Sequence, residues 1–174
     1  AMQLVVFNKP FQVLPQFTSP DGRRSLADYL SLPGLYPAGR LDYDSEGLLL
    51  FTNDPQWAAR ITSPESGPDK AYHVQVDCIP DVAMLASMQA GVACEGAMLR
   101  AKSVQLLRAG EKNAWLEVVL DEGRNRQIRR LLAELDIGVL RLLRVAIGTL
   151  QLGQLPKGQW RPLTAEEVAA LGGD

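Results

Sequence analysis

The chain has 174 residues, 47% of them hydrophobic and 22% charged, and a formal net charge of −2. That length is enough for one well-packed core and too short for several independent domains. No apolar run approaches the ~20 residues of a membrane-spanning helix, and the first residues lack a signal-peptide pattern. The sequence therefore predicts a cytoplasmic protein and excludes a membrane protein.

Cysteine and histidine are scarce, since the sequence contains only Cys78, Cys94 and His73. The two cysteines have neither the CxxC spacing nor the neighbouring histidines of a zinc site, and they are too few for a disulfide framework. We expect reduced thiols and no bound metal.

Positive charge is concentrated in one segment, although the whole chain is slightly acidic. Between residues 123 and 144 the only acidic residues are Glu134 and Asp136. The arginines of this segment are Arg124, Arg126, Arg129, Arg130, Arg141 and Arg144. The net charge argues against a nucleic-acid partner, because phosphate binding is driven mainly by Lys and Arg. The clustering outweighs the net charge and predicts one basic face.

Turn and capping residues divide the N-terminal third into short elements. Residues 3–7 have the pattern of a strand, and Ser25 is the expected cap of a short helix through residue 30. The continuous apolar run 48–51 is typical of a strand buried on both faces. Asp54 followed by proline predicts the start of another short helix, which continues to residue 61.

The middle of the chain predicts strands and one helix. Residues 70–78 alternate in polarity, with Tyr72 on the buried side. Residues 81–89 have the composition of a helix. Residues 102–108 and 114–120 alternate again, and we expect them to pair as a hairpin.

From Asn125 the apolar residues follow the period of a helix. Its predicted apolar face consists of Ile128, Leu131, Leu132 and Leu135. Arg126 and Arg130 fall on the opposite face, and Arg129 lies at the border between the two.

The C-terminal part predicts a strand over 139–147, a short strand at 160–161 and a last helix with a Thr164–Glu167 capping box. Strands dominate the whole pattern, are mostly sequential neighbours and alternate with short helices. This favours an α+β fold around a largely antiparallel mixed sheet.

An acidic turn, residues 39–47, holds three carboxylates within five residues. Asp42, Asp44 and Glu46 follow Arg40 and lead straight into the apolar run 48–51. Placing charged side chains beside a buried strand costs desolvation free energy, so such a cluster indicates a functional role. We therefore expect a reactive carboxylate in this turn.

Metal-binding interpretations of the acidic turn fit poorly. As a calcium loop it would place Asn53 where a bidentate Glu is required. As a magnesium site for phosphoryl transfer it would need a buried strand before Asp42, whereas the strand follows. For Asp44 and Glu46 a supporting role in shaping the turn is the favoured interpretation.

An Asp42 held ionised by arginine fits better. Arg40 is two residues away, and in an extended segment such side chains point the same way. A second arginine-rich element would complete the site, because a neighbouring cation lowers the pKa of a carboxylate. The helix from Asn125 supplies one, and Arg129 at its border is best placed to reach into a cleft.

Five motifs, in order and with matching spacing, resemble those of the RsuA-type pseudouridine synthases. The segment 39–48 looks like the catalytic signature of that family, and residues 122–130 look like its third motif. Residues 8–10, residues 70–72, and residues 142–144 with Gly148 resemble the other three.

The resemblance implies the catalytic fold of that family, with flanking short helices and a central active-site cleft. It implies a single catalytic domain over residues 1–174, with two sub-lobes around the cleft and no S4 domain. The activity implied is isomerisation of one uridine in large-subunit ribosomal RNA, free or in an assembly intermediate, without metal or organic cofactor. We expect a monomer.

The resemblance also implies roles for individual residues. Asp42 would be the nucleophile and Arg129 would keep it ionised. Tyr72, the third catalytic residue, would stack on the flipped uracil and offer its hydroxyl to take the C5 proton. Arg40 would occupy the gap left by the extruded base, and Leu143 would press on the uracil from its other side. Further contacts with RNA or with the site are expected from Lys9, Lys70, Arg126, Arg130 and Arg144.

Two departures from the family pattern and two alternative functions accompany this interpretation. Tyr43 stands where relatives often carry a basic residue, and Arg126 stands where more distant synthases carry a histidine. A non-catalytic RNA-binding module would bind RNA without turnover. A magnesium-dependent phosphohydrolase would lose its activity to a chelator.

Overall fold

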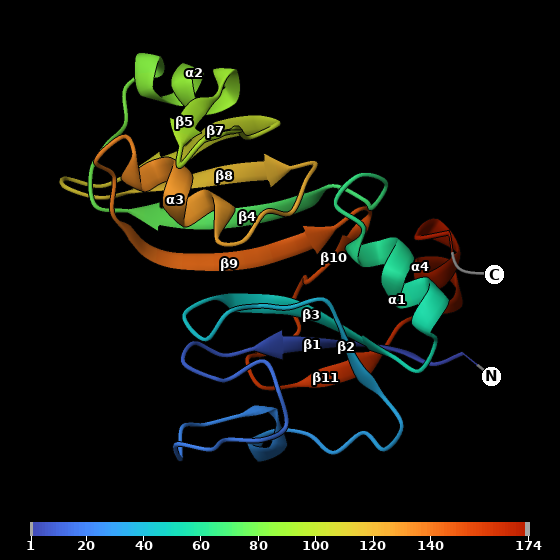
Figure 1. The fold of residues 1–174 in the computed structure, drawn as a ribbon. Helices are drawn as coiled ribbons and strands as arrows, with labels where there is room; N and C mark the ends of the chain where they lie inside the picture. Colours follow the sequence, from blue (N-terminus) through green and yellow to red (C-terminus); the bar gives the residue numbers. More distant parts are fainter. Residues whose placement is uncertain (1, 173–174) are drawn as a thin grey trace.

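The computed structural model describes residues 2–172, and its main feature is one nine-stranded sheet (Figure 1). The strands are β1 (Leu4–Lys9), β2 (Tyr36–Ala38), β3 (Glu46–Thr52), β4 (Lys70–Val76), β5 (Val92–Cys94), β6 (Ala97–Leu99), β7 (Ser103–Ala109), β8 (Ala114–Leu120), β9 (Val139–Ile147), β10 (Leu150–Gln151) and β11 (Trp160–Pro162). The helices are the 3₁₀ helix η1 (Leu26–Asp28), α1 (Pro55–Thr62), α2 (Val82–Ala90), α3 (Gln127–Ala133) and α4 (Ala165–Ala170).

β3 and β9 join the two halves of the sheet. The order is β11-β1-β3-β9-β4-β8-β7, with β2 added to β3 and β10 added to β9, while β5 and β6 form a separate pair. Among the named strands of residues 2–172, β3 and β9 are the only parallel pair, and they match Glu46 with Leu143 and Gly47 with Arg144. The predicted α+β class and largely antiparallel mixed sheet are confirmed.

Gly47 makes the parallel pairing possible. Its φ is +104°, and a Cβ at this position would lie 2.9 Å from the main-chain nitrogen of Arg144 and closer still to its carbonyl oxygen. A side chain here would force the two backbones apart. The glycine therefore holds the end of the acidic turn directly against β9.

Separate apolar cores stabilise the two halves. One half packs β4, β7 and β8 with α2 and α3 around residues such as Leu116 and Leu131. In the other half, two clusters cover opposite faces of β1 and β3, one containing Leu50 and the other Phe51. Figure 1 shows α2 and α3 with the first half and α1 beside α4 with the second. One sheet runs through both, and the single domain with two sub-lobes stays a prediction.

Elements that depend on local signals form where the sequence predicts them. The Asp54 carboxylate caps α1 by accepting hydrogen bonds from the first-turn amides, and Thr164 and Glu167 form the capping box of α4. The strand predicted over 139–147 is β9, with the same bounds, and β7 and β8 form the predicted hairpin.

Other elements differ from the prediction. The sequence pattern does not reveal β2, β5, β6 and β10, because two or three residues are too few to show alternation. Ser25 caps a single 3₁₀ turn rather than a longer helix. α3 begins at Gln127 rather than Asn125, because Arg126 has a left-handed backbone conformation. None of the helices within residues 2–172 combines the length and apolar character needed to cross a bilayer.

Candidate active site

A cleft of about 620 Å³ lies beside the junction of β3 and β9. Its lining comes from the acidic turn, the start of β4, the segment 123–129 and the cleft-facing side of β9. Of the residues predicted for the site, it contains Arg40, Asp42, Lys70, Tyr72, Arg126, Arg129 and Arg144. Residues distant in the chain therefore meet in one place, and the predicted central cleft is present.

The acidic turn presents Asp42 from a closed and anchored loop. The amide of Ser45 donates to the Asp42 carbonyl oxygen at 3.0 Å, which closes the turn. Leu41 is buried in the core beneath it. The Asp42 side chain retains 32% exposure and lines the cleft. The fold thus fixes the backbone on either side of this carboxylate while leaving the carboxylate accessible.

Arg126 bridges the two aspartates of the turn. Its Nη1 lies 3.1 Å from Asp42 Oδ2 and 3.1 Å from Asp44 Oδ1, while its Nη2 donates to Asp44 Oδ2 at 2.7 Å. The planar fork of a guanidinium suits such pairing. The hydrogen bond from Arg126 is the main reason that the pKa of Asp44 is lowered, and Asp44 raises the pKa of Arg126 in return. The sequence predicts that Arg126 contacts RNA, but in the structure its guanidinium donates hydrogen bonds to these two aspartates.

Arg126 reaches the aspartates from a strained backbone. Its φ of 51° and ψ of 38° are left-handed, which costs a residue other than glycine of order 1–3 kcal/mol. Its carbonyl oxygen accepts the first helical hydrogen bond of α3, from the Arg130 amide at 3.0 Å. Such a conformation persists only where the surrounding contacts fix it, and these positions concentrate at functional sites.

Arg129 also reaches the acidic turn, but its direct contacts are with Asp44. Its Nη2 donates to the Asp44 carbonyl oxygen at 2.7 Å, and its Nε lies 3.5 Å from Asp44 Oδ2. Burial lowers the pKa of Arg129, while the charges of Asp44 and Asp42 act in the opposite direction. The guanidinium in contact with Asp42 is therefore that of Arg126, and Arg129 braces the turn that carries Asp42.

β4 and β9 supply further predicted residues. Tyr72 and Lys70 come from the first residues of β4, and burial, followed by the charge of Arg144, lowers the pKa of Lys70. Arg144 is only 5% exposed, and its Nε donates to the Leu48 carbonyl oxygen at 2.9 Å. Arg144 is thus a buried support of the site rather than a solvated charge.

Arg40 is an exposed residue of the cleft. Its carbonyl oxygen accepts a hydrogen bond from Arg144 Nη1 at 3.5 Å, which ties its backbone to β9. Its own guanidinium has no hydrogen bond or ion pair with any residue that the structure describes. This leaves a cation at the cleft that is available to a ligand.

Two of the predicted RNA contacts lie outside the cleft. Lys9 is fully buried, and its Nζ donates to the Val13 carbonyl oxygen at 2.8 Å, so it cannot reach a phosphate. Burial also lowers its pKa to about 8. Arg130 is directed toward Glu95, 3.7 Å away. The prediction for Lys9 needs correction, because sequence alone does not distinguish a buried cation from a surface one. The Arg130 side chain is 32% exposed, and its contact with RNA stays a prediction.

The prediction for Leu143 also needs correction. Leu142 lines the cleft, whereas Leu143 lines a separate hollow together with His73 on the other face of the sheet. Successive residues of a strand point to opposite faces, so only one of two adjacent leucines can face the cleft. Leu142 is the leucine that lines the cleft.

The two cations that bind Glu46, at the end of the acidic turn, were not predicted. Glu46 is 2% exposed and accepts hydrogen bonds from Arg141 Nη2 at 2.9 Å and from Lys157 Nζ. Burial pushes the pKa of Glu46 upward, but the hydrogen bonds from Arg141 and Lys157 outweigh it and lower the pKa. Lys157 belongs to a turn far along the chain, and no sequence signal connects it with Glu46.

The donor arrangement does not suit the metal-binding alternatives. The Arg126 guanidinium occupies the space between Asp42 and Asp44 that a divalent cation would need. Asn53, at the last ligand position of the calcium interpretation, accepts a hydrogen bond from the Gln3 amide. Across residues 2–172 there is no group of three or more His, Cys, Asp or Glu side chains placed to hold a metal ion.

Known proteins are similar to this chain in sequence and in fold. The family described as RNA pseudouridylate synthase matches residues 3–134. A ribosomal large subunit pseudouridine synthase E from Vibrio parahaemolyticus serotype O3:K6 is 39% identical over 175 residues, covering 92% of this chain and 74% of that protein. A protein of the same name from Xanthomonas campestris pv. campestris is 43% identical over 182 residues, covering 95% and 97%. A crystal structure of pseudouridylate synthase matches with a TM-score of 0.84 and 32% identity, covering 98% of this chain and 74% of the other.

Proposed function

This chain belongs to the RNA pseudouridylate synthase family, and on that premise we propose that it converts one uridine of large-subunit ribosomal RNA to pseudouridine, with Asp42 as nucleophile. The family resemblance drawn from the five sequence motifs is confirmed. The choice of RNA is supported by the two relatives named for the large ribosomal subunit.

The proposed reaction is an isomerisation without net oxidation or group transfer. The bond from ribose C1′ to uracil N1 breaks, the ring rotates, and a bond from C1′ to C5 forms. The C5 proton leaves and N1 gains a proton, so no metal or organic cofactor is needed to balance the reaction. Asp42 attacks the ribose or the uracil ring and is released when the new bond is complete.

The Asp42–Arg126 contact within the cleft carries the proposal. The Arg126 guanidinium donates a hydrogen bond to Asp42 Oδ2 at 3.1 Å, which fixes the orientation of a carboxylate that can act as a nucleophile. The cleft volume of about 620 Å³ lies within the range of sites that enclose a small ligand, and it suits one extruded nucleoside. Tyr72 and Leu142 offer an aromatic and an aliphatic surface to the base.

Arg40 fits the role of holding an extruded base out of the RNA. A base within a folded RNA must leave the stack before it can react. The Arg40 guanidinium is exposed beside Asp42 and has no partner among the described residues. It can therefore stack or form hydrogen bonds where the base was. Lys70, Arg129 and Arg144 would hold the surrounding site. We propose that the protein acts as a cytoplasmic monomer, on free ribosomal RNA or an assembly intermediate.

Release of tritium from ribosomal RNA labelled at uridine C5 tests the function. We expect wild-type protein to release it in the presence of excess chelator, and Asp42→Asn to abolish release while still binding the RNA. Asp54→Asn is the matched control, because Asp54 only caps α1 and an asparagine retains the acceptor. Undiminished release by Asp42→Asn would reject the assignment of the nucleophile. Binding by wild-type protein without release from any ribosomal RNA would reject the enzymatic function.

A further inference from the structure

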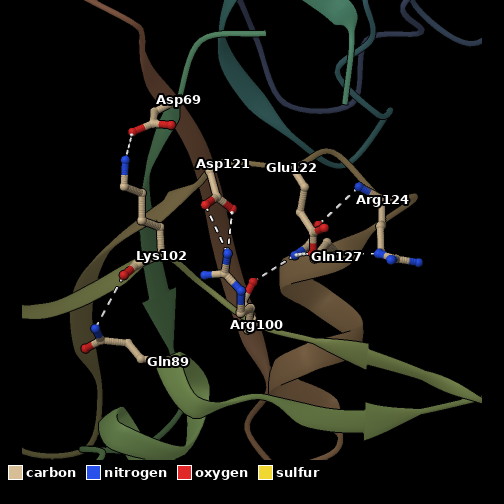
Figure 2. Close-up of polar contacts among 8 residues, drawn as sticks. All are labelled: Asp69, Gln89, Arg100, Lys102, Asp121, Glu122, Arg124 and Gln127. Carbon is tan, nitrogen blue, oxygen red and sulfur yellow. Dashed lines mark hydrogen bonds and ion pairs between the residues drawn. The ribbon is translucent and has the colours of Figure 1, made fainter. Parts of the chain in front are cut away.

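Gln127 is a buried polar residue that lines the cleft, and its side-chain hydrogen bonds within residues 2–172 all go to residues outside the acidic turn. It is 2% exposed, yet its side-chain amide is fully engaged (Figure 2). Its Oε1 accepts from the Arg124 amide at 3.1 Å, and its Nε2 donates to the Arg100 carbonyl oxygen at 2.8 Å and to Glu122 Oε1 at 3.1 Å. A buried amide satisfied on both ends is a structural constraint, because losing either set of bonds leaves groups unpaired.

The constrained segment is the one that carries Arg126. The Gln127 main-chain amide donates to the Arg124 carbonyl oxygen at 3.2 Å, so main chain and side chain of Gln127 hold the same residue. On the other side, Arg130 Nε donates to the Asn125 carbonyl oxygen at 2.9 Å. The left-handed backbone of Arg126 is thus enclosed by hydrogen bonds that are all made without its own side chain.

We propose that Gln127 is a positioning residue for the isomerisation, which holds Arg126 in the conformation from which its guanidinium spans Asp42 and Asp44. This inference rests on the proposed function, since it assigns Gln127 a part in setting up the nucleophile. Through the Arg100 carbonyl oxygen, Gln127 also ties the segment to the connection between β6 and β7.

The role requires an amide rather than any polar side chain. A carboxylate at position 127 could still accept from the Arg124 amide, but it would face the Arg100 carbonyl oxygen and the Glu122 carboxylate without a proton to donate. Gln89 provides a matched comparison in the same view (Figure 2): its Nε2 donates to the Lys102 carbonyl oxygen at 3.4 Å from the exposed surface of α2.

Steady-state kinetics of Gln127→Glu, with Gln89→Glu as control, test the proposal. Because buried groups are left unpaired in Gln127→Glu, we expect kcat to fall by about tenfold or more, with KM for the RNA changed less than about twofold. Gln89→Glu should match wild type. A Gln127→Glu protein with the kcat of the control would overturn the inference, whereas wild-type protein without activity would instead overturn the proposed function.

A double-mutant cycle separates positioning from general damage. If Gln127 acts through Arg126, Gln127→Glu will lower kcat little further in an Arg126→Ala background, because the two changes remove one effect. Equal losses in both backgrounds would contradict the inference. If Gln127→Glu does not fold, the cycle is run with the double variant Gln127→Glu/Glu122→Gln in its place. In that variant the amide at position 122 donates to the carboxylate at position 127, which restores one hydrogen bond in the opposite direction.

Discussion

The main chain of Gly47 lies against that of Arg144 so closely that no Cβ could be placed between them. The Arg144 side chain strengthens the same junction, since its Nε donates to the Leu48 carbonyl oxygen and its Nη1 to the Arg40 carbonyl oxygen. Both ends of the acidic turn are thereby attached to one residue of β9. The position of Asp42 in the cleft depends on this attachment.

Gly47→Ala should lower the free energy of unfolding by about 2–4 kcal/mol, because the substitution adds backbone strain and a backbone clash. Urea unfolding measures the loss. Gly34→Ala is the control for strain alone, since Gly34 has a φ of +79° with open space around it; we expect a loss of about 1 kcal/mol there. Equal losses at the two positions would show that the contact with Arg144 is not the cause.

Asp44→Asn should destabilise the protein at neutral pH and not at acid pH. Arg126 lowers the pKa of Asp44 in the folded state. Ionised Asp44 therefore stabilises the folded state above the unfolded pKa of about 3.9, and this stabilisation is lost as the pH falls through the folded pKa. The pair is partly exposed, and we expect about 0.5–1 kcal/mol at pH 7 after solvent screening. Urea unfolding at pH 7 and pH 3 checks this, and a difference from wild type that is undiminished at pH 3 would contradict it.

Lys9→Met should change how stability depends on alkaline pH. The folded pKa of Lys9 is about 8, below its ordinary value of 10.5, so both states are protonated below pH 8 and the burial penalty is then complete. As the pH rises from 8 toward 10.5 the folded state loses its proton first, and the penalty disappears. Relative to Lys9→Met, wild type should gain about 2 kcal/mol between pH 7.5 and pH 10.

Urea unfolding of both proteins across that range measures the Lys9 effect. Lys112→Met, at an exposed position, is the control and should show no such gain. A constant difference between wild type and Lys9→Met at all pH values would refute the depressed pKa. The same variant should keep wild-type affinity for RNA, because the Lys9 ammonium is buried.

Arg40→Ala should lower kcat/KM by roughly tenfold to a hundredfold while leaving the melting temperature unchanged, since an exposed guanidinium without partners contributes to substrate handling alone. Arg40→Lys should recover part of the loss, because it keeps the charge without the flat guanidinium. Arg108→Ala, which removes an arginine that packs over Trp115 outside the cleft, is the control. Activity of Arg40→Ala equal to that of the control would exclude the proposed part in base extrusion.

Local chemistry explains which elements the sequence reveals. Asp54 and Thr164 predict the starts of helices, because a capping residue binds amides within one turn of its own position. The continuous apolar run of β3 predicts a strand that is buried on both faces. Of the strands of two or three residues, only β11 is predicted from the sequence, whereas β2, β5, β6 and β10 are not. Their pairing is decided by neighbours elsewhere in the chain, as β2 is by β3.

The residues of the site likewise divide into those that local sequence predicts and those that depend on distant parts of the chain. Asp42 and the arginine-rich helix could be found from residue type and spacing, because the chemistry requires a carboxylate beside a cation. The choice between Arg126 and Arg129 depends on one left-handed residue, and the choice between Leu142 and Leu143 depends on the phase of β9, whose register with β4 shifts twice. The burial of Lys9 is likewise a property of the assembled fold.

β9 has a further consequence for how the enzyme is made. It enters the middle of the sheet, between β3 and β4, although both of these strands precede it by a long stretch of chain. A chain emerging from the ribosome therefore keeps the inner edges of β3 and β4 unpaired until residues 139–147 arrive, which favours slow closure and exposure to chaperones. The nascent protein carries Asp42 early, but it acquires the cleft only after residues 139–147 have been made.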